Sequence, residues 1–343
     1  MRKLLNILYV TTPESYVARD GENVIIRVEN ETRFRIPIHN LEGIVCFGYT
    51  GASPALLGLC AERGVTVSFL TEHGKFLAKV TGGVMGNVLL RRRQYRVADN
   101  ELESIQIAIN LIAGKLANSR VTLQRAVRDH ANSIDVQEVL GVTRFLSNQI
   151  PRLSACKSLD ELRGLEGEAA RAYFSVLDEL ILHQKDVFFM HGRSRRPPKD
   201  NMNALISFLY TLLAHDVESA LETVGLDPYV GFMHADRPGR AGLALDIMEE
   251  LRAYFCDRLA LSLINRKQIS AKGFYAKESG GVVMDHDTRK IVLTAWQQKK
   301  QEEITHPFLG EKIKIGLLPY VQAMLMARFL RGDLDGYPPF LWK

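Results

Sequence analysis

The sequence predicts an α+β protein in which a small, mostly β N-terminal domain is followed by a larger all-α domain. Three observations predict this division. The first 90 residues are rich in short β-prone runs separated by turn residues. From about residue 100 the apolar residues recur at helical spacing. The length of 343 residues also suits two domains, each able to bury a core. The predicted boundaries are 1–90 for the β domain, 91–99 for an arginine-rich basic linker and 100–343 for the helical domain.

The N-terminal domain is predicted to hold a series of strands and one helix. Ser53 can cap this helix, Pro54 suits its first turn, and Gly64 follows its end. Turn-forming residues at 20–23 separate two of the strands. The predicted strands cover residues 4–12, 16–19, 24–28, 33–38, 44–48, 65–71 and 76–82.

The second domain is predicted to be helical almost to its end. Its main interruption is the segment 191–200, because the pair Pro197-Pro198 cannot lie inside a helix. Two series of apolar residues follow a period of 3.6: Ile105, Ile109, Ile112, Leu116, Leu123 and Val127, and then Leu205, Phe208, Leu209, Leu212 and Leu213.

Composition excludes several classes of protein. With 46% hydrophobic and 24% charged residues, disordered, collagen-like and disulfide-scaffold chains are excluded. The four cysteines form no CxxC pair, and no apolar run reaches the roughly 20 residues that span a bilayer. We therefore expect a cytoplasmic protein with no signal peptide and no membrane partner. Phosphate-binding, dinucleotide-binding, nucleophile-elbow and HExxH zinc motifs are absent from the sequence. The net charge of +5 is compatible with nucleic-acid binding but does not establish it.

A first candidate site lies in the segment LRGLEGEAARAYF, residues 162–174. Gly164 and Gly167 lie inside an otherwise helical stretch, and each costs about 1 kcal/mol relative to alanine. Helices accept glycine where another backbone or a ligand comes close. Glu166 lies between the two glycines and could point into a sheltered site. By pattern alone, the more frequent interpretation of such a segment is an exposed acidic surface that includes Glu168.

A second candidate site combines a loop, GFMHADRPGR (231–240), with a helix, LALDIMEELR (243–252). His234 lies on the loop, while Asp246, Glu249 and Glu250 share one face of the helix. Carboxylates clustered beside a histidine can hold a divalent cation, because like charges tolerate proximity only around something positive. A solvated acidic helix face remains the alternative.

The segments at 162–174 and 231–252, with NALISFLYTLL (203–213) between them, follow the order of the motifs of one protein family. The resemblance covers nearly the whole chain. The chain is similar to the CRISPR-associated integrases, the first-numbered Cas proteins, which insert new spacers into CRISPR arrays. The ending GYPPFLWK (336–343) resembles members of subtype I-C. This ending could be a docking peptide for a partner or an end packed on its own domain, and the sequence favours neither.

The resemblance implies a catalytic and metal-binding triad of Glu166, His234 and Asp246. Some family members place a second acidic residue three positions after the aspartate, which makes Glu249 a further candidate metal ligand, with Glu250 beside it. The family's DNA-contacting positions match Arg237 and Arg252, and Arg240 lies beside them in the sequence. Asn203 and Tyr210 match the segment between the triad members and are expected to support the site.

The resemblance also implies the reaction and the partners. A DNA 3′-hydroxyl would attack a phosphodiester of the CRISPR repeat, with Mg²⁺ or Mn²⁺ as cofactor and a preference for manganese, which tolerates an imidazole ligand better. The expected partners are double-stranded DNA (protospacer and repeat), a second copy of the chain joined through the β domain, and the small second-numbered Cas protein. A metal-dependent repair nuclease that cuts branched DNA without integration is the alternative activity. A metal-independent nucleic-acid-binding scaffold is the alternative outside the enzymes.

Overall fold

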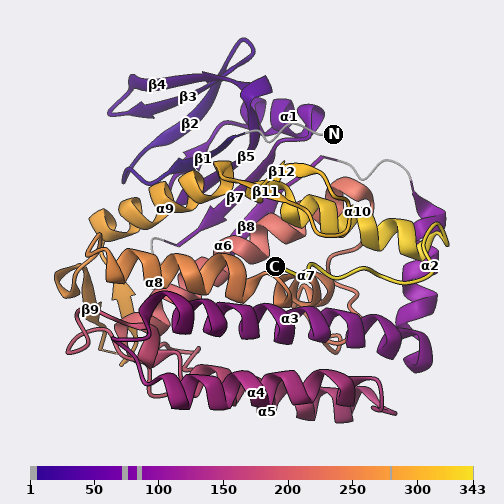
Figure 1. Ribbon diagram of the computed structural model, residues 1–343. Coiled ribbons are helices and arrows are strands. Elements are labelled where there is room, and N and C mark those ends of the chain that lie inside the picture. The colour runs from indigo at the N-terminus through magenta and orange to yellow at the C-terminus, as the bar shows by residue number, and fades with distance from the viewer. Residues whose placement is uncertain (1–5, 72–75, 83–86, 279, 343) are drawn as a thin grey trace. The chain divides into compact units, whose positions relative to one another are not determined.

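The computed structural model describes residues 6–71, 76–82, 87–278 and 280–342 (Figure 1). The chain forms two compact units. A strand-rich unit contains the described residues up to 82 together with Met284–Gln298, and a helical unit contains the rest. The predicted order of a small β part followed by a large helical part is confirmed.

The strand-rich unit contains two four-stranded sheets. In the first sheet, with the order β1-β5-β7-β8, the first three strands are parallel and β8 is antiparallel to β7. The second sheet has the order β4-β3-β2-β6 and contains the hairpin predicted around residues 20–23. The strands are β1 (Asn6–Val10), β2 (Tyr16–Asp20), β3 (Asn23–Val28), β4 (Glu31–Pro37), β5 (Leu41–Phe47), β6 (Gly51–Ala52), β7 (Thr66–Leu70) and β8 (Phe76–Val80).

The one helix predicted among these strands is α1 (Pro54–Arg63). The hydroxyl of Ser53 accepts a hydrogen bond from the backbone N–H of Leu56, and Gly64 ends the helix in the left-handed conformation with φ 67°. The helix buries Leu56, Leu59 and Cys60 in a core that also contains Val17, Val24, Ile44 and Val67. Local cap and turn chemistry therefore agrees with the packing. Of the predicted first strand, residues 4 and 5 lie outside the described residues.

Two of the predictions differ from the structure, one on the linker and one on the all-α character of the second domain. Residues 91–98, predicted as part of a basic linker, form most of helix α2 (Val88–Ala98), because Leu90, Gln94 and Val97 share one buried face of it. The helical region is also not purely α: it carries two short antiparallel pairs, β9 (Phe274–Ala276) with β10 (Val282–Met284), and β11 (Glu303–Thr305) with β12 (Lys312–Lys314). The predicted interruption at 191–200 is confirmed as irregular backbone.

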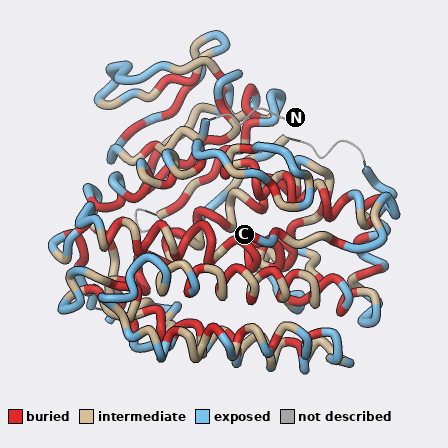
Figure 2. Tube along the Cα trace, viewed as in Figure 1, coloured by how far each residue is buried: buried red, intermediate tan, exposed pale blue. Residues whose placement is uncertain are grey.

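The helical unit is built on long helices that pack side by side. Helix α3 lies along α4 and α5, and α6 packs against α7 and α10 (Figure 1). Buried positions recur along one side of α3 (Figure 2). The helices are α3 (Glu101–His130), α4 (Val136–Leu153), α5 (Leu159–Ser175), α6 (Asn201–Val224), α7 (Gly242–Glu249), a π-helical segment (Arg252–Asp257), α8 (Arg258–Asn265) and α10 (Leu318–Leu330), while α9 (His286–Gln301) lies mostly in the strand-rich unit.

Helix α6 is the one described helix that is long and apolar enough to cross a membrane. Its most apolar window has a mean hydropathy of 1.2, and 56% of that window is buried inside the protein. The helix packs against α7 and α10, so its apolar residues have protein partners. This burial is what a core helix of a folded domain requires.

The C-terminal tail, residues 336–342, is packed on the helical unit. Tyr337 and Phe340 are buried, and two guanidinium groups lie over the Trp342 ring, with Arg125 at 4.1 Å and Arg258 at 4.3 Å from its centroid. Of the two possibilities for this ending, the structure therefore supports the packed one over the free docking peptide.

Candidate active site

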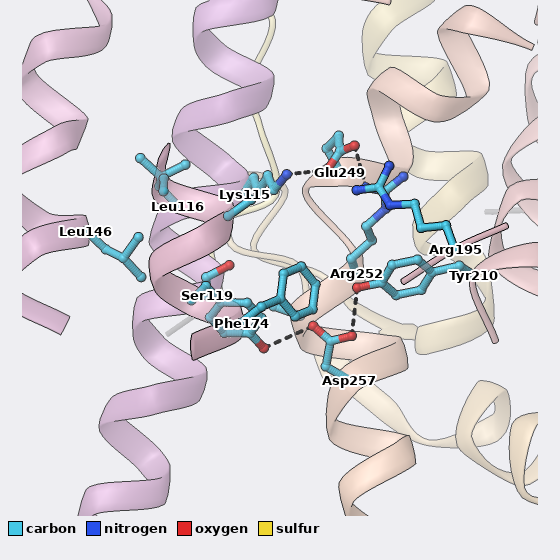
Figure 3. Close-up of a pocket in the computed structure, with 14 residues that line it drawn as sticks. Lys115, Leu116, Ser119, Leu146, Phe174, Arg195, Tyr210, Glu249, Arg252 and Asp257 are labelled. Atoms are coloured by element: carbon cyan, nitrogen blue, oxygen red, sulfur yellow. Dashed lines mark hydrogen bonds and ion pairs between the residues drawn. The ribbon is translucent and has the colours of Figure 1, made fainter. Parts of the chain in front are cut away.

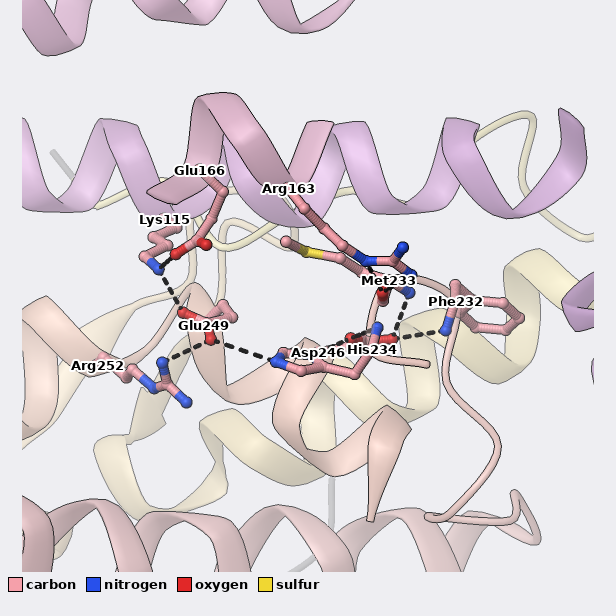
Figure 4. A network of polar contacts seen from close by, with 9 residues as sticks. All are labelled: Lys115, Arg163, Glu166, Phe232, Met233, His234, Asp246, Glu249 and Arg252. Atoms are coloured by element: carbon pink, nitrogen blue, oxygen red, sulfur yellow. Dashed lines mark hydrogen bonds and ion pairs between the residues drawn. The ribbon is translucent and has the colours of Figure 1, made fainter. Parts of the chain in front are cut away.

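Three segments bring their acidic and imidazole groups together within the helical unit (Figure 4). Glu166 lies in the middle of α5, a helix that Ser158 caps by accepting a hydrogen bond from the Glu161 N–H. His234 comes from the loop before α7, and Asp246 and Glu249 come from α7 itself. Glu166 forms an ion pair with the ammonium of Lys115 on α3. The segments that the sequence singled out thus meet in one place.

The carboxylate of Asp246 is fully buried and accepts hydrogen bonds from the loop that carries His234. Its Oδ2 accepts the backbone N–H groups of Phe232 and Met233 at 2.6 and 3.0 Å. Its Oδ1 accepts the backbone N–H of His234 at 3.0 Å and lies 2.6 Å from His234 Nδ1. Four contacts to one carboxylate fix both the loop backbone and the imidazole ring. The geometry favours a positioning role for Asp246 over the ligand role predicted for it.

The same contact decides which nitrogen of His234 is available. An ionised carboxylate only accepts hydrogen bonds, so Nδ1 carries the proton that faces Asp246. Nε2 is then left with its lone pair and points toward Glu249, with Oε1 of that residue 4.0 Å away. An imidazole oriented in this way by a carboxylate is the arrangement that metal-ligating histidines use.

Glu249, the acid that faces Nε2 of this imidazole, is almost fully enclosed, with 4% of its side chain exposed. Arg252 Nη1 lies 2.5 Å from its Oε1, and Lys115 Nζ lies 2.8 Å from its Oε2. Burial alone would raise the pKa of Glu249, but Arg252, Lys115 and His234 more than offset burial and lower it to about 2. Glu249 is therefore ionised throughout the neutral pH range.

Glu250, the third acid on this stretch, faces another way. Its carboxylate accepts hydrogen bonds from the Tyr337 hydroxyl at 2.5 Å, from Gln322 Nε2 at 2.9 Å and from the Phe340 N–H at 2.7 Å. Tyr337 and Phe340 belong to the C-terminal tail, so Glu250 anchors the tail to the helical unit. Of the three acidic residues between which the sequence could not choose, only Glu249 presents its carboxylate to His234 Nε2.

The donor set fits a divalent cation in chemistry. Glu166, Glu249 and the unprotonated Nε2 of His234 offer two carboxylates and one imidazole, a combination suited to Mn²⁺ and acceptable to Mg²⁺. Among the described residues, Glu249 Oε2 is buried without a hydrogen bond of good geometry. Within that same part of the chain, no three His, Cys, Asp or Glu groups already stand at ligating positions. Lys115 supplies the positive charge between the two glutamates.

The three arginines predicted to contact DNA are placed differently. Arg237 is exposed and Arg240 is partly exposed, both on the loop that carries His234. The pKa of Arg240 is lowered by partial burial and by the nearby cations Arg237, Arg163 and Arg196, which marks a concentration of positive charge beside the site. Arg252 is 13% exposed, is paired with Glu249, and lies over the Tyr210 ring at 4.9 Å. In this structure its guanidinium is thus an internal partner of Glu249, and DNA contact by Arg252 stays a prediction.

The close approach expected at Gly164 and Gly167 occurs at other glycines. A Cβ at either of those positions would meet nothing within 4 Å. A Cβ at Gly231, in contrast, would lie 2.7 Å from the backbone of Gly242 and 2.8 Å from Asp246 Oδ2. Glycine at 231 therefore lets the His234 loop close over the start of α7.

A sequence profile of the family described as "CRISPR associated protein Cas1" matches residues 8–298. The chain belongs to the CRISPR-associated Cas1 family. It is 54% identical over 343 residues, covering all of both chains, to a protein of Chlorobaculum tepidum named "CRISPR-associated endonuclease Cas1 1". The predicted membership and the prediction of an enzyme of the Cas1 endonuclease family are confirmed.

Solved structures share the Cas1 fold. A casposase bound to integration product aligns with a TM-score of 0.85 at 20% identity, covering 99% of this chain and 95% of that one. A chain of a "Cas6-RT-Cas1--Cas2 complex" aligns with a TM-score of 0.83 at 22% identity. All of the present chain corresponds to 36% of that longer chain. At these identities the likeness shows the fold alone.

Sequence reasoning about this Cas1 chain missed two residues that organise the site. Arg163 donates from Nε and Nη2 to the carbonyl oxygen of Met233, at 3.0 and 2.6 Å, and so ties the His234 loop to the helix that carries Glu166. Lys115 bridges Glu166 and Glu249. Arg163 belongs to the segment that carries the resemblance, whereas Lys115 lies alone in an amphipathic helix with no local signal.

A buried polar cluster around Asp257 lies next to Glu249 (Figure 3). The hydroxyls of Tyr210 and Tyr173 donate to Asp257 at 2.8 and 3.0 Å. A cavity of about 20 Å³, large enough for one water, lies between this cluster and Glu249. Asn203, also expected to support the site, accepts hydrogen bonds from Arg193 and from the Ser194 N–H. Arg193 lies over the Tyr210 ring at 5.4 Å, so both expected supports belong to one connected group.

Burial raises the pKa of Asp257 from 3.8 to about 6, although its hydrogen bonds from Tyr210 and Tyr173 oppose the shift. Between these two pH values the folded chain holds a proton that the unfolded chain has released. The stability that this group contributes is therefore present in full below pH 3.8 and is lost as the pH rises through 6. A shift of two units corresponds to about 3 kcal/mol.

We expect the substitution Asp257→Asn to remove this dependence. Urea unfolding of both proteins at pH 4 and pH 7 measures it. Relative to the variant, the wild type should lose about 2–3 kcal/mol of unfolding free energy between the two pH values. Parallel pH profiles for the two proteins would show that Asp257 titrates normally in the folded chain.

Proposed function

We propose that this chain is a metal-dependent DNA integrase of the Cas1 family, which joins a DNA 3′-hydroxyl to a phosphodiester of the CRISPR repeat. The observation that carries the proposal is the convergence of Glu166, His234 Nε2 and Glu249 beside an arginine-rich loop. The metal ligands of this proposal are Glu166, His234 and Glu249. Asp246 becomes the residue that orients His234, a revision of the triad expected from the sequence.

The residues divide the work of the reaction between them. Asp246 holds the proton on Nδ1 of His234, so that Nε2 keeps a free lone pair. Before a metal binds, Arg252 and Lys115 keep Glu249 ionised in spite of its burial. A bound Mg²⁺ or Mn²⁺ supplies Lewis acidity that stabilises charge on the phosphorus and lowers the pKa of the attacking hydroxyl. The new P–O bond forms to the incoming 3′-oxygen as the bond to the repeat's 3′-oxygen breaks. The proton of the attacking hydroxyl is released, and the leaving oxygen is protonated.

The DNA substrate is supported by the charge around the site. Arg237 and Arg240, with Arg163 and Arg196 near Arg240, concentrate positive charge on the side of the His234 loop. We expect these groups to contact phosphates, so that affinity falls steeply with salt. Insertion of both ends of a fragment needs two active sites, which fits a homodimer. The solved "Cas6-RT-Cas1--Cas2 complex", a chain of which has the same fold, contains Cas1 together with Cas2, which supports the second-numbered Cas protein as a partner in the prokaryotic cytoplasm.

The test compares the wild type with His234→Ala in a strand-joining assay. A 3′-hydroxyl duplex is incubated with a supercoiled plasmid that carries the repeat, with Mn²⁺ and the second Cas protein. Joined products should disappear in the variant while gel-shift binding to DNA is retained. His130→Ala, which changes an exposed histidine at the end of α3, serves as the matched control and should join normally.

The outcomes separate the competing activities. Joining that survives His234→Ala would show that the active site lies elsewhere. Cleavage that depends on His234, with no joining under any condition, would assign the chain to the metal-dependent nucleases without integration. DNA binding with neither reaction would favour the scaffold function.

A further inference from the structure

Lys115 lies between the two carboxylates that the proposed function assigns to a divalent cation. Its ammonium group forms ion pairs with Glu166 and with Oε2 of Glu249, the latter at 2.8 Å. Its side chain is 12% exposed, so this charge lies largely inside the site (Figure 4). Both carboxylates are ligands in the proposed function. The lysine and a metal ion therefore compete for the same oxygen atoms.

The ammonium compensates charge that would otherwise be costly. Glu249 is almost fully enclosed, and an enclosed carboxylate without a cation is destabilising. Arg252 forms an ion pair with one side of Glu249, whereas Lys115 forms ion pairs with both Glu249 and Glu166. A lysine is well suited to a replaceable role, because its charge is a single point at the end of a flexible chain that can extend to solvent.

We propose that Lys115 is an internal cation that occupies the site in the metal-free protein and is displaced when the divalent ion binds. This inference rests on the metal site of the proposed function. It has two consequences. Lys115 stabilises the metal-free fold by neutralising Glu166 and Glu249, and it weakens metal binding because its ion pairs must break first.

The first test measures Mn²⁺ binding by calorimetry for the wild type and for Lys115→Met, which keeps the length of the side chain and removes its charge. We expect the variant to bind Mn²⁺ about tenfold more tightly or better. Its metal-free melting temperature should be lower than that of the wild type, and the gain in melting temperature on adding Mn²⁺ should be larger. Arg128→Met removes the same charge from an exposed position of α3 and should change neither quantity.

A second measurement uses the wild type and does not depend on the folding of a variant. Amine acetylation followed by mass spectrometry reports how accessible each lysine is. Mn²⁺ should raise the labelling of Lys115 severalfold, while that of the exposed Lys157 stays constant. Unchanged or reduced labelling of Lys115 would overturn the proposal, as would unchanged or weaker Mn²⁺ binding by Lys115→Met.

Parallel titrations of His234→Ala distinguish failure of this inference from failure of the proposed function. If the wild type binds Mn²⁺ and His234→Ala does not, the metal site stands and the Lys115 results alone decide the inference. If the wild type shows no Mn²⁺ binding that depends on His234, both the metal site and the role of Lys115 are overturned.

Discussion

Replacing Asp246 by asparagine is expected to lower the rate of strand joining by two to four orders of magnitude. The expectation follows from the four hydrogen bonds that its carboxylate accepts, three from successive backbone N–H groups and one from His234 Nδ1. An asparagine can present a donor to the imidazole and so select the wrong tautomer. In serine proteases the equivalent change from aspartate to asparagine lowers turnover about 10⁴-fold through the wrong tautomer.

The measurement that identifies the role of Asp246 is Mn²⁺ affinity. An orienting residue typically contributes 10–100-fold to metal affinity, so Asp246→Asn should bind Mn²⁺ weakly, whereas His234→Ala should not bind it at all. Unfolding by urea should also show a loss of about 3 kcal/mol, because buried N–H groups lose a charged acceptor. Asp236→Asn, at an exposed position of the same loop, is the matched control. Complete loss of Mn²⁺ binding in a folded Asp246→Asn protein would return Asp246 to the ligands.

Removal of the Trp342 side chain is expected to destabilise the helical unit by about 3–5 kcal/mol. Trp342 is 9% exposed, its ring is contacted by the guanidinium groups of Arg125 and Arg258, and it meets the Tyr254 ring edge-on with centroids 4.8 Å apart. Its loss removes the cation–π contact of the Trp342 ring with each of the two guanidinium groups.

Urea unfolding of Trp342→Ala, followed by circular dichroism, measures this effect. The neighbouring Leu341 is 41% exposed, and Leu341→Ala should change stability by less than about 0.5 kcal/mol. Fluorescence adds a second readout, because the chain has two tryptophans and the other one, Trp296, belongs to the strand-rich unit. An equal and small effect of both substitutions would mean that the tail is not part of the stable core.

The parts of the fold that the sequence predicted are those encoded by neighbouring residues. The cap at Ser53 and the left-handed Gly64 lie within one turn of the helix ends that they determine, so they could be recognised without a partner. Helix α2 was missed because its run of arginines resembles a solvated linker. Its buried face depends on Gln94, whose side chain donates to the carbonyl oxygens of Asp227 and Val230. Such a long-range contact leaves no local pattern.

The candidate site shows the same division. Glu166 and His234 could be chosen from motifs, because each lies in a distinctive glycine-containing segment. The choice between Asp246 and Glu249 could not be made, since residues three apart lie on the same face of a helix. What separates the two residues is the path of the His234 loop, because that loop folds back over Asp246 and its backbone N–H groups donate to the Asp246 carboxylate. Backbone geometry of this kind is visible only in the folded chain.

The C-terminal tail also has a consequence for the order in which the molecule folds. Asn118 donates to the carbonyl oxygen of Phe340 and accepts the N–H of Trp342, contacts that join positions 222 and 224 residues apart. The closure of such long loops is entropically unfavourable and is repaid only when the contacts themselves form, so these contacts form late. The Asn118 side chain also donates a hydrogen bond to the carbonyl oxygen of Glu250, the residue directly after Glu249. The geometry around Glu249 is therefore expected to mature in the final steps of folding, and a partly folded chain would carry the arginines of the His234 loop before the site beside them is complete.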